Sequence, residues 1–361
     1  MKIINLDNYK KKWIDKLSFN MSLTEKFGLY IANPFCEKKC SFCIYRSKVC
    51  TENSILYENY YNKFLYNNII NFKDIIDIKT PDFMYFGGGT PSLMNHNTMI
   101  KIFSLFSNIN EIKFKCFEAN PNSLSKKKID VLSEFQFDEV SLGVQTFNYE
   151  LAKKYNRYNC SLEIISELVN YAMDKKIKTN VDIMAFLDYN LDIDLNRLKN
   201  DLRILKTNLN IAKITIYPYY SAYTKADINN KLNMMKKLKD TIREFCVNLN
   251  FSAINDSCLS TNEIDILKYG LSDYHLYNNS IDYLKLRRYN CSGPGKIPST
   301  QNILSFGGYL NHIPYSYIKN EGEWFNVNID GNLNIVEESY NKEIKIDDIF
   351  SFVQSKYNLT T

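Results

Sequence analysis

The sequence predicts an α/β fold, a partial (β/α)6 TIM-like barrel followed by a C-terminal accessory region. Short apolar segments of strand length alternate along the chain with longer segments whose apolar residues recur at helical spacing. This alternation is the pattern of parallel βα units. The chain has 361 residues, which is enough for a barrel of roughly 200–250 residues and an additional region.

Six strand–helix units are expected. The strands are short and apolar and end in turn-forming or polar residues, whereas the helices carry apolar and aromatic residues three or four positions apart. The expected strands are 27–35, 82–86, 113–119, 139–144, 179–186 and 213–217. The helices that follow them are 54–76, 97–106, 125–135, 161–175, 192–205 and 225–248.

Helical periodicity weakens after residue 248. Residues 290–300 are rich in turn-forming residues and are expected to form a loop. Asp330-Gly331 is a candidate hairpin turn, and Asp347 is an N-cap candidate for a final helix over 347–357. We therefore expect an N-terminal extension (1–25), a barrel (26–250) and a C-terminal accessory region that contributes to the substrate pocket (251–361).

The composition is that of a globular protein, because 45% of the residues are hydrophobic and 24% are charged. A net charge of +5 without long basic runs does not indicate a nucleic-acid partner. No segment approaches the roughly 18 apolar residues of a membrane span, and the N-terminus lacks the apolar core of a signal peptide. We expect a cytoplasmic protein without a membrane partner.

Cys36, Cys40 and Cys43 lie close together directly after the first strand. A [4Fe–4S] cluster usually takes four Cys ligands, so three thiolates leave one iron open for a ligand that is not protein. The alternative is a structural zinc site with Cys50 as the fourth ligand. Neither a second CxxC nor an HxxxH pair is present to complete such a site, and the other cysteines are scattered singly.

The Cys-x3-Cys-x2-Cys pattern, with Phe42 directly before the last Cys, resembles the signature of radical S-adenosylmethionine (SAM) enzymes. The resemblance implies that the three cysteines hold a [4Fe–4S] cluster whose open iron binds SAM. An electron from the cluster then cleaves SAM to a 5′-deoxyadenosyl radical, which abstracts hydrogen from a small-molecule substrate. The reactive chemistry belongs to the cofactor, and the implied electron donor is a carrier such as flavodoxin or ferredoxin.

The second strand ends in Gly87-Gly88-Gly89-Thr90-Pro91. Missing side chains let the backbone approach a ligand closely, although a glycine triplet by itself more often forms a turn. Behind the cysteine motif, this triplet resembles the glycine motif that holds the SAM amino group in radical SAM enzymes.

Three later segments resemble those of oxygen-independent coproporphyrinogen III oxidase and its relatives, a branch of the same superfamily. They are 117–121, 141–147 and 154–157, and Asp182 follows in an otherwise apolar strand. A buried Asp costs free energy unless it is paired, so we expect Asp182 to have a partner. The resemblance places Tyr30, Phe42, Gly88 and Glu118 at the radical-forming SAM, and Gly89, Thr90, Gln145, Arg157 and Asp182 at a second SAM.

The chain departs from this branch at three positions. Ala32-Asn33-Pro34 stands where the branch has His-Ile-Pro, and Tyr45 stands where the oxidase has a further Cys. Tyr289-Asn290 stands where heme-chaperone members have His-Asn, so a heme ligand is missing. The three histidines, His96, His275 and His312, are each expected to be structural or solvated.

The resemblance implies a two-SAM enzyme that transfers a methyl or methylene group to an unactivated carbon of a small molecule or peptide-derived substrate. Two alternatives remain open. One is tetrapyrrole chemistry, either decarboxylation of porphyrinogen side chains or breakdown of heme. The other is a heme chaperone without catalytic activity.

Overall fold

The structure is a computed structural model. It describes residues 11, 14–15, 26–43, 47–51, 54–157, 160–219, 228–253, 274–279, 301–306, 309–310, 313–320, 323–329 and 335–342. The chain forms two compact units, Met1–Cys36 with Tyr45–Lys115 and Tyr289–Thr361, and Glu37–Ile44 with Cys116–Arg288. The domain boundaries expected at residues 25 and 250 stay a prediction.

In the first unit, β1 (Lys26–Asn33) pairs in parallel with β4 (Phe83–Gly88) on one side and with β11 (Gln301–Phe306) on the other. From β11 the sheet continues through antiparallel strands. These are β13 (Ile313–Asn320), β14 (Glu323–Ile329) and β15 (Ile335–Lys342), and β12 (Tyr309–Leu310) also pairs with β13. A short parallel pair joins β2 (Phe35–Cys36) to β3 (Lys48–Val49).

The predicted C-terminal hairpin is confirmed by the antiparallel pairing of β14 with β15. The turn residues Asp330-Gly331, the loop over 290–300 and the helix over 347–357 lie outside the described residues. The pairing of β1 with β11 was not predicted, because a parallel partner more than 250 residues away leaves no local signal.

The helix expected over 54–76 is broken into four pieces. They are α2 (Ile55–Asn59), a π-helical segment (Tyr60–Leu65), α3 (Tyr66–Asn71) and α4 (Lys73–Ile78). The wider π turn lets Tyr57, Tyr60 and Tyr61 all pack against the Phe35 ring, with centroid distances of 5.1–6.4 Å. Helix α5 (His96–Phe103) and two 3-10 turns, Pro91–Leu93 and Ile109–Glu111, complete this unit.

The second unit contains four parallel strands, which are neighbours in the sheet in the order in which they follow one another along the chain. They are β5 (Phe114–Ala119), whose first two residues belong to the first unit, β6 (Glu139–Gln145), β7 (Lys178–Ala185) and β8 (Lys213–Pro218). Strand β10 (Tyr274–Asn278) pairs antiparallel with β8, and β9 (Phe251–Ala253) with β10. These last two strands were not predicted.

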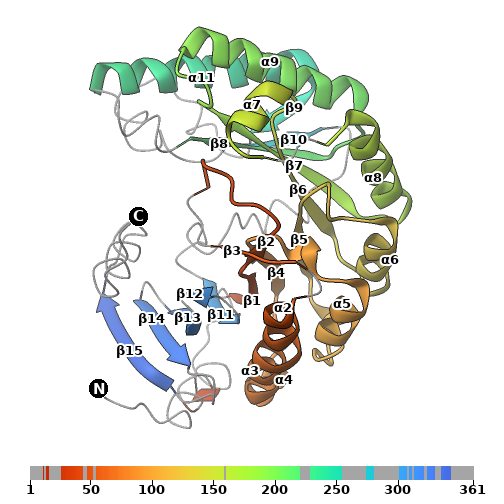
Figure 1. Ribbon diagram of the computed structural model, residues 1–361, viewed down its shortest axis with the longest axis vertical. Helices are drawn as coiled ribbons and strands as arrows, with labels where there is room; N and C mark the ends of the chain where they lie inside the picture. The colour runs from red at the N-terminus through yellow and green to blue at the C-terminus, as the bar shows by residue number, and fades with distance from the viewer. Residues whose placement is uncertain are drawn as a thin grey trace. The chain divides into compact units, whose positions relative to one another are not determined.

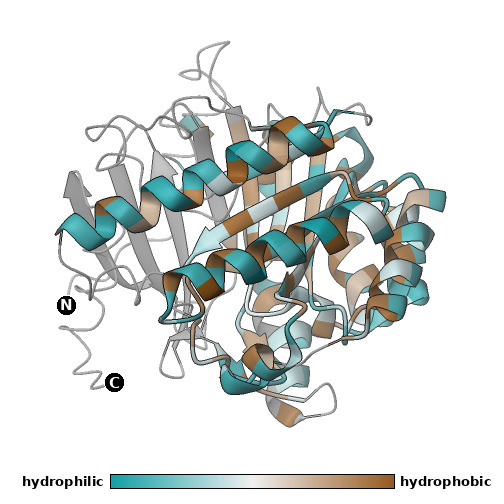
Figure 2. Ribbon diagram, turned by 90° about the horizontal axis from the view of Figure 1, so that it is seen from above, coloured by the Kyte–Doolittle hydropathy of each residue, from teal (hydrophilic) through white to brown (hydrophobic). Residues whose placement is uncertain are grey.

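Helices of the second unit lie along one side of β5–β8 (Figure 1). They are α6 (Lys126–Glu134), α8 (Leu162–Asp174), α9 (Leu191–Asn208) and α11 (Ile228–Leu249), with the short α7 (Tyr149–Lys154) after β6. The side chains of Ser125, Ser161 and Asn190 cap α6, α8 and α9 by accepting from backbone N–H groups. Helices α9 and α11 pack side by side, and Figure 2 shows hydrophobic residues at intervals along both.

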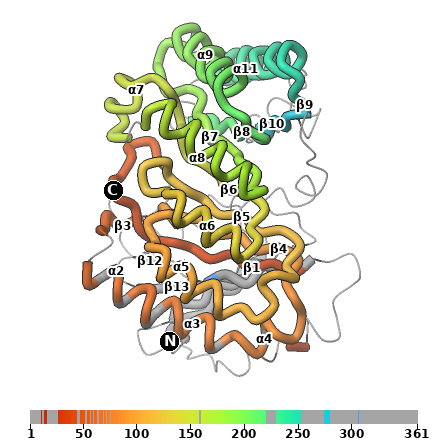
Figure 3. Tube along the Cα trace, turned by 90° about the vertical axis from the view of Figure 1, so that its right-hand side faces the viewer, coloured from red at the N-terminus to blue at the C-terminus, as the bar shows by residue number. Residues whose placement is uncertain are grey.

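The predicted α/β class is confirmed, because the sheet is mostly parallel and helices follow its strands. Along the chain, β4, β5, β6, β7 and β8 are each followed by helix, and the short pair β2–β3 stands between β1 and its helix α2, so six βα units are present as expected (Figure 3). Predicted and observed boundaries differ by at most two residues in these strands and by at most three at the helix ends. Within the described residues, no helix combines the length and apolar character that a membrane span needs.

Candidate cofactor site

The second part of the cysteine loop is held by α7. Ser41 N donates to Tyr155 O at 3.0 Å, and Cys43 N donates to Cys40 O at 3.1 Å. Asn156 Nδ2 donates to Lys39 O at 2.9 Å. Because these bonds use the backbone, the loop keeps its conformation regardless of the side chains at its exposed positions.

Phe42 packs against a small apolar cluster in the same unit. Its ring lies 5.8 Å from the Tyr155 ring, and the cluster also contains Leu151, Met184 and Leu187. Helix α7, which supplies Leu151 and precedes Tyr155, was not predicted, because six residues are too few to show helical periodicity. Asn148, which caps this helix by accepting from Leu151 N at 2.9 Å, is the signal that was available.

Cys36 lies at the end of β2 in the first unit. Its carbonyl accepts from Cys50 N at 3.0 Å, and Thr90 Oγ1 donates to its Sγ at 3.4 Å. Cys50 is buried, with its Sγ 2.8 Å from Ser54 Oγ. The structure thus places Thr90, expected at the second SAM, against the first cysteine of the motif.

The glycine triplet is packed against the end of β1. Gly88 has φ +101°, and a Cβ there would lie 2.7 Å from Asn33 O. A Cβ on Gly89 would lie 2.5 Å from Phe35 O. Gly89 N donates to Asn33 O at 2.6 Å. Glycine is therefore required at both positions by backbone contact alone, since a side chain would collide with a carbonyl oxygen.

Tyr30, Gly87 and Glu118 complete the predicted set of cofactor-binding residues. Tyr30 is buried in β1 and stacks on Tyr85 with a centroid distance of 5.8 Å. Gly87 is buried in β4, opposite Ala32 in register. Glu118 is half-buried in β5 and lies opposite Ser141 in register.

Cys36, Cys40 and Cys43 are not joined in disulfides in the part of the chain that the structure describes. Among the residues that the structure describes, no three His, Cys, Asp or Glu side chains gather as a single metal ion requires. In a [4Fe–4S] cluster each thiolate binds a different iron, so its sulfurs need not surround one point. Three thiols in one short segment are suitable ligands for such a cluster. One of them, Cys36, also accepts a hydrogen bond from the Thr90 hydroxyl.

A row of residues crosses one face of the sheet over strands β6, β7, β8 and β10. Gly143 of β6 lies opposite Asp182 of β7, Asp182 opposite Thr215 of β8, and Thr215 opposite His275 of β10. Residues in register on paired strands point to the same side of a sheet. The polar side chains of this row therefore lie on one face of the sheet. Ser141 and Asn180 lie two residues earlier on β6 and β7, so their side chains are on the same face.

Gln145 and Arg157 both lie against Gly143. Arg157 Nη2 donates to Gly143 O. A Cβ on Gly143 would lie 3.0 Å from Gln145 Nε2 and 3.2 Å from Arg157 Nη2, so a larger residue there would displace the ends of both side chains by a few tenths of an ångström. Gln145 itself has φ +74° beside a bulge between β6 and β7, a backbone strain that is concentrated at functional sites.

Arg157 also links this region to the cysteine loop. Its Nη1 donates to Cys40 Sγ at 3.8 Å. Its Nε is buried and has no hydrogen-bond partner. Leaving a buried guanidinium donor without a hydrogen bond costs free energy. An anionic acceptor such as a carboxylate would form a strong, charge-assisted hydrogen bond with it.

Asp182 has hydrogen-bond partners, as its burial in a strand led us to expect. Ser141 Oγ donates to Oδ2 at 2.9 Å, and Asn180 Nδ2 donates to Oδ1 at 2.7 Å. Burial raises the pKa of Asp182 to about 7, although these two hydrogen bonds and the charge of Lys213 act to lower it. The carboxyl group is therefore poised to ionise near neutral pH.

A buried ion pair lies near the beginning of these strands. Lys213 Nζ is 2.8 Å from Glu139 Oε1, and the Cys116 thiol is 3.7 Å from the same oxygen. Ser141, Asn180, Lys213 and Thr215 were not predicted as site residues. The available signal was their spacing, because polar residues two positions apart in apolar strands mark one face.

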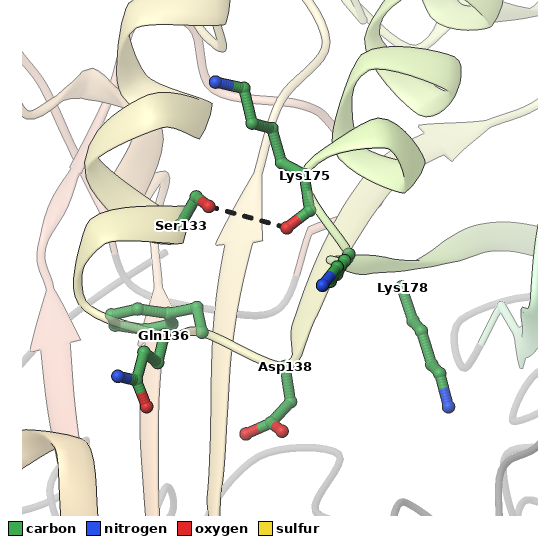
Figure 4. A pocket seen from close by; sticks show the side chains of 7 residues that line it. Ser133, Gln136, Asp138, Lys175 and Lys178 are labelled. Carbon is green, nitrogen blue, oxygen red and sulfur yellow. Dashed lines mark hydrogen bonds between the residues drawn. The ribbon is translucent and has the colours of Figure 1, made fainter.

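A pocket of about 310 Å³ lies where β6 and β7 begin, between the ends of α6 and α8 (Figure 4). Ser133 Oγ donates to Lys175 O at 3.5 Å across it. It contains none of the predicted site residues, which lie further along the strands. Its lining consists of Ser133, Gln136, Phe137, Asp138, Lys175, Lys176 and Lys178.

Residues 30–202 match the Radical SAM superfamily. The chain therefore contains a radical SAM domain, and the cofactors of that family are a [4Fe–4S] cluster and SAM. This match confirms the resemblance that the cysteine motif indicated. It covers the cysteine loop and, of the row, Gly143 and Asp182.

The chain is similar in sequence to heme chaperones and to oxygen-independent coproporphyrinogen III oxidases. The heme chaperone HemW of Buchnera aphidicola subsp. Acyrthosiphon pisum is 27% identical over 312 residues, 79% of this chain and 77% of its own. An oxygen-independent coproporphyrinogen III oxidase of Helicobacter pylori is 30% identical over 179 residues, 46% of this chain and 37% of its own. This chain is therefore similar to proteins of the branch that its motifs resemble.

A solved structure shows the same fold. Coproporphyrinogen III oxidase (HemN) from Escherichia coli matches with a TM-score of 0.64 over 97% of this chain and 82% of its own, at 17% identity. At this identity the likeness concerns the fold alone.

Proposed function

We propose that this protein is a radical SAM enzyme that binds a second SAM molecule at Gln145, Arg157 and Asp182. It uses that molecule to transfer a methyl or methylene group to an unactivated carbon of a small molecule or peptide-derived substrate. The observation that carries the proposal is the arrangement around Gly143. Gln145 and Arg157 contact this residue and Asp182 lies opposite it in register.

The proposed cluster ligands are Cys36, Cys40 and Cys43. When bound, the cluster and its SAM supply the reductive cleavage that starts the radical chemistry. This chain's own residues position and shield it. Thr90 and Arg157 direct N–H or O–H donors at the sulfurs of Cys36 and Cys40. Tyr30, Phe42, Gly88 and Glu118 are the proposed contacts of the radical-forming SAM, with Gly87 beside them.

The chemistry of the second site matches the groups of SAM. Arg157 offers its unpartnered Nε to a carboxylate. Asp182 accepts two hydrogen bonds from the protein, and its remaining lone pairs can accept from an ammonium group or from ribose hydroxyls. Gln145 adds an amide, and Gly89 and Thr90 are proposed as further contacts on the basis of the family resemblance.

Equilibrium dialysis of SAM on the anaerobically reconstituted protein tests this proposal. We expect two SAM equivalents in the parent and one in Arg157→Ala and Asp182→Ala. Losing a hydrogen bond to a charged group costs roughly 1.5–3 kcal/mol. Both variants should still form 5′-deoxyadenosine but not S-adenosylhomocysteine. The exposed residues Arg203 and Asp174 provide matched controls, Arg203→Ala and Asp174→Ala. A single equivalent in the parent would refute the second site.

Tetrapyrrole chemistry is the alternative enzymatic function, favoured by similarity to coproporphyrinogen III oxidase. Release of CO2 from coproporphyrinogen III without S-adenosylhomocysteine would support it. In either case the proposed electron donor is an acidic carrier such as flavodoxin or ferredoxin, because Lys38 and Lys39 make the exposed side of the cysteine loop basic.

A heme chaperone is the second candidate, and the specific observation for it is the HemW relative, which matches over most of both chains. Saturable binding of heme with a Soret shift, together with no 5′-deoxyadenosine formation from SAM, would favour the chaperone over the enzyme.

A further inference from the structure

The row from Gly143 to His275 contains a continuous chain of hydrogen bonds. Thr215 Oγ1 lies 3.0 Å from Asn180 Oδ1 and 3.2 Å from His275 Nδ1. Asn180 Nδ2 lies 2.7 Å from Ser141 Oγ and 2.7 Å from Asp182 Oδ1. Thr215 and Asn180 therefore connect His275 to the Asp182 carboxylate, and Ser141 bridges Asn180 and Asp182.

The direction of the Asn180 amide is set by Asp182. With Asp182 ionised, as at pH 8, a reversed amide would place its oxygen 2.7 Å from a carboxylate oxygen, and the two acceptors would face each other without a proton. The amide nitrogen must therefore face Asp182. Its other proton goes to Ser141 Oγ, which leaves the single Ser141 proton for Asp182 Oδ2 at 2.9 Å.

The same proton count determines the state of His275. The Asn180 oxygen only accepts, so the one proton of the Thr215 hydroxyl is donated to it. Thr215 Oγ1 has no second proton to give to His275, so it must accept from His275 Nδ1. His275 Nδ1 therefore carries a proton, and every hydrogen bond along the chain points toward Asp182.

Burial leaves the groups of this network no partners other than one another. Thr215, Asn180 and Ser141 are all buried, so water is not a substitute partner, and an unpaired group there would cost roughly 1–3 kcal/mol. The charged groups that act most on Asp182 are Lys213 and Glu139, which form an ion pair with each other. His275 is thus the outermost donor of a chain that ends on a carboxylate of the proposed second SAM site.

We propose that His275 is a positioning residue for Asp182. Its Nδ1–H, acting through Thr215 and Asn180, holds the Asp182 carboxylate in one orientation with both oxygens as acceptors. The remaining lone pairs then face a ligand that carries hydroxyl or ammonium donors. This inference rests on the proposed second SAM site and adds a residue that lies outside the match to the radical SAM family.

The protonation of His275 is tested by nitrogen NMR of the histidine side chains in the reconstituted protein at pH 8. The chain has three histidines, so the His275 signals are identified by their loss in His275→Asn. We expect a proton on Nδ1 in the parent and loss of that preference in Thr215→Val. Thr179→Val is the matched control, because the Thr179 hydroxyl is buried in β7 without a hydrogen bond. An unprotonated Nδ1 in the parent would overturn the inference.

The positioning role is tested by SAM binding. Thr215→Val and His275→Leu should weaken the second SAM equivalent about tenfold and leave the first unchanged. Thr215→Ser and His275→Asn, which retain a donor at the same place, should bind like the parent. Two equivalents with parental affinity in Thr215→Val and His275→Leu would overturn the role of His275 and leave the proposed function standing. A parent that binds one equivalent would instead refute the second site, and the positioning role with it.

Discussion

At the scale of single residues, the cysteines of the chain divide by their surroundings. Cys36 and Cys40 each receive a hydrogen bond at sulfur from a residue outside the motif. Cys116 is buried among apolar groups beside the Glu139–Lys213 pair, and burial raises its pKa well above the ordinary value. Burial of this kind disfavours the thiolate that a metal requires, so Cys116 is a poor candidate for a metal ligand.

We predict that Cys36→Ala, Cys40→Ala and Cys43→Ala each lose the cluster, whereas Cys50→Ala and Cys116→Ala retain it. The measurement is iron and sulfide content after anaerobic reconstitution, where about four of each per chain are expected for one cluster. Loss of iron in Cys50→Ala would show that the buried thiol beside Ser54 belongs to the ligand set.

The hydrogen bond from Thr90 to Cys36 predicts an effect on the cluster potential. Hydrogen bonds to cluster sulfurs stabilise the reduced state. Thr90→Val, which keeps the shape and removes the hydroxyl, should therefore lower the midpoint potential, and Thr90→Ser should restore it. Titration of the cluster followed by electron paramagnetic resonance measures both. Equal potentials in Thr90→Val and the parent would show that this bond does not act on the cluster.

Asp182 predicts a pH dependence of stability. Its pKa in the folded protein is about 7, above the ordinary 3.8. The folded protein therefore binds the proton more tightly than the unfolded chain, and folding stability falls as the pH rises from about 4 to 7. Asp182→Asn does not titrate, so its melting temperature relative to the parent should rise between pH 5 and pH 8. Asp174→Asn, at an exposed position of α8, should show no such change.

At the scale of elements, a buried network joins the loops that follow β6 and β7. Arg197 of α9 lies 2.9 Å from Asp194 and 2.6 Å from Asp201. Asp194 accepts from the backbone N–H groups of Phe186, Leu187 and Asp188 after β7. Asp201 accepts from Thr146 Oγ1 and Phe147 N after β6. The network therefore holds the loop that begins directly after Gln145.

We predict that Arg197→Met destabilises the protein by about 3–5 kcal/mol, because it leaves two buried carboxylates without their cation. Urea unfolding measures the change. Arg203→Met on the exposed side of the same helix is the control and should change the free energy of unfolding by less than about 0.5 kcal/mol. A small effect at Arg197 would mean that the carboxylates are protonated or satisfied by their backbone donors alone.

At the scale of the whole molecule, similarity to heme chaperones extends over most of the chain, whereas the family resemblance places Tyr289 where their His-Asn pair has its histidine. We predict that heme titration gives no saturable Soret shift at one equivalent, because a neutral imidazole ligand is missing from that position. Tyr289→His tests the reason, since it should create or strengthen heme binding. Saturable binding by the parent would require another ligand.

The sequence by itself determined the fold class, the order of the six βα units and the motifs. These are local properties: strands and helices differ in the period of their apolar residues, and Cys36, Cys40 and Cys43 lie within one short segment. The match over residues 30–202 confirms the family that this segment indicated. Asp182 was also recognised locally, because a carboxylate in an apolar strand requires a partner.

Only the tertiary structure decided which residues meet. The pairing of β1 with β11, the approach of Arg157 to Gly143 and Cys40, and the hydrogen-bond chain from His275 to Asp182 all join distant positions of the chain. His275 was expected to be structural or solvated, because a lone histidine in a sequence carries no sign of its neighbours. Strand pairing and register place it beside Thr215. Such contacts depend on how strands align in the folded sheet, which local periodicity does not encode.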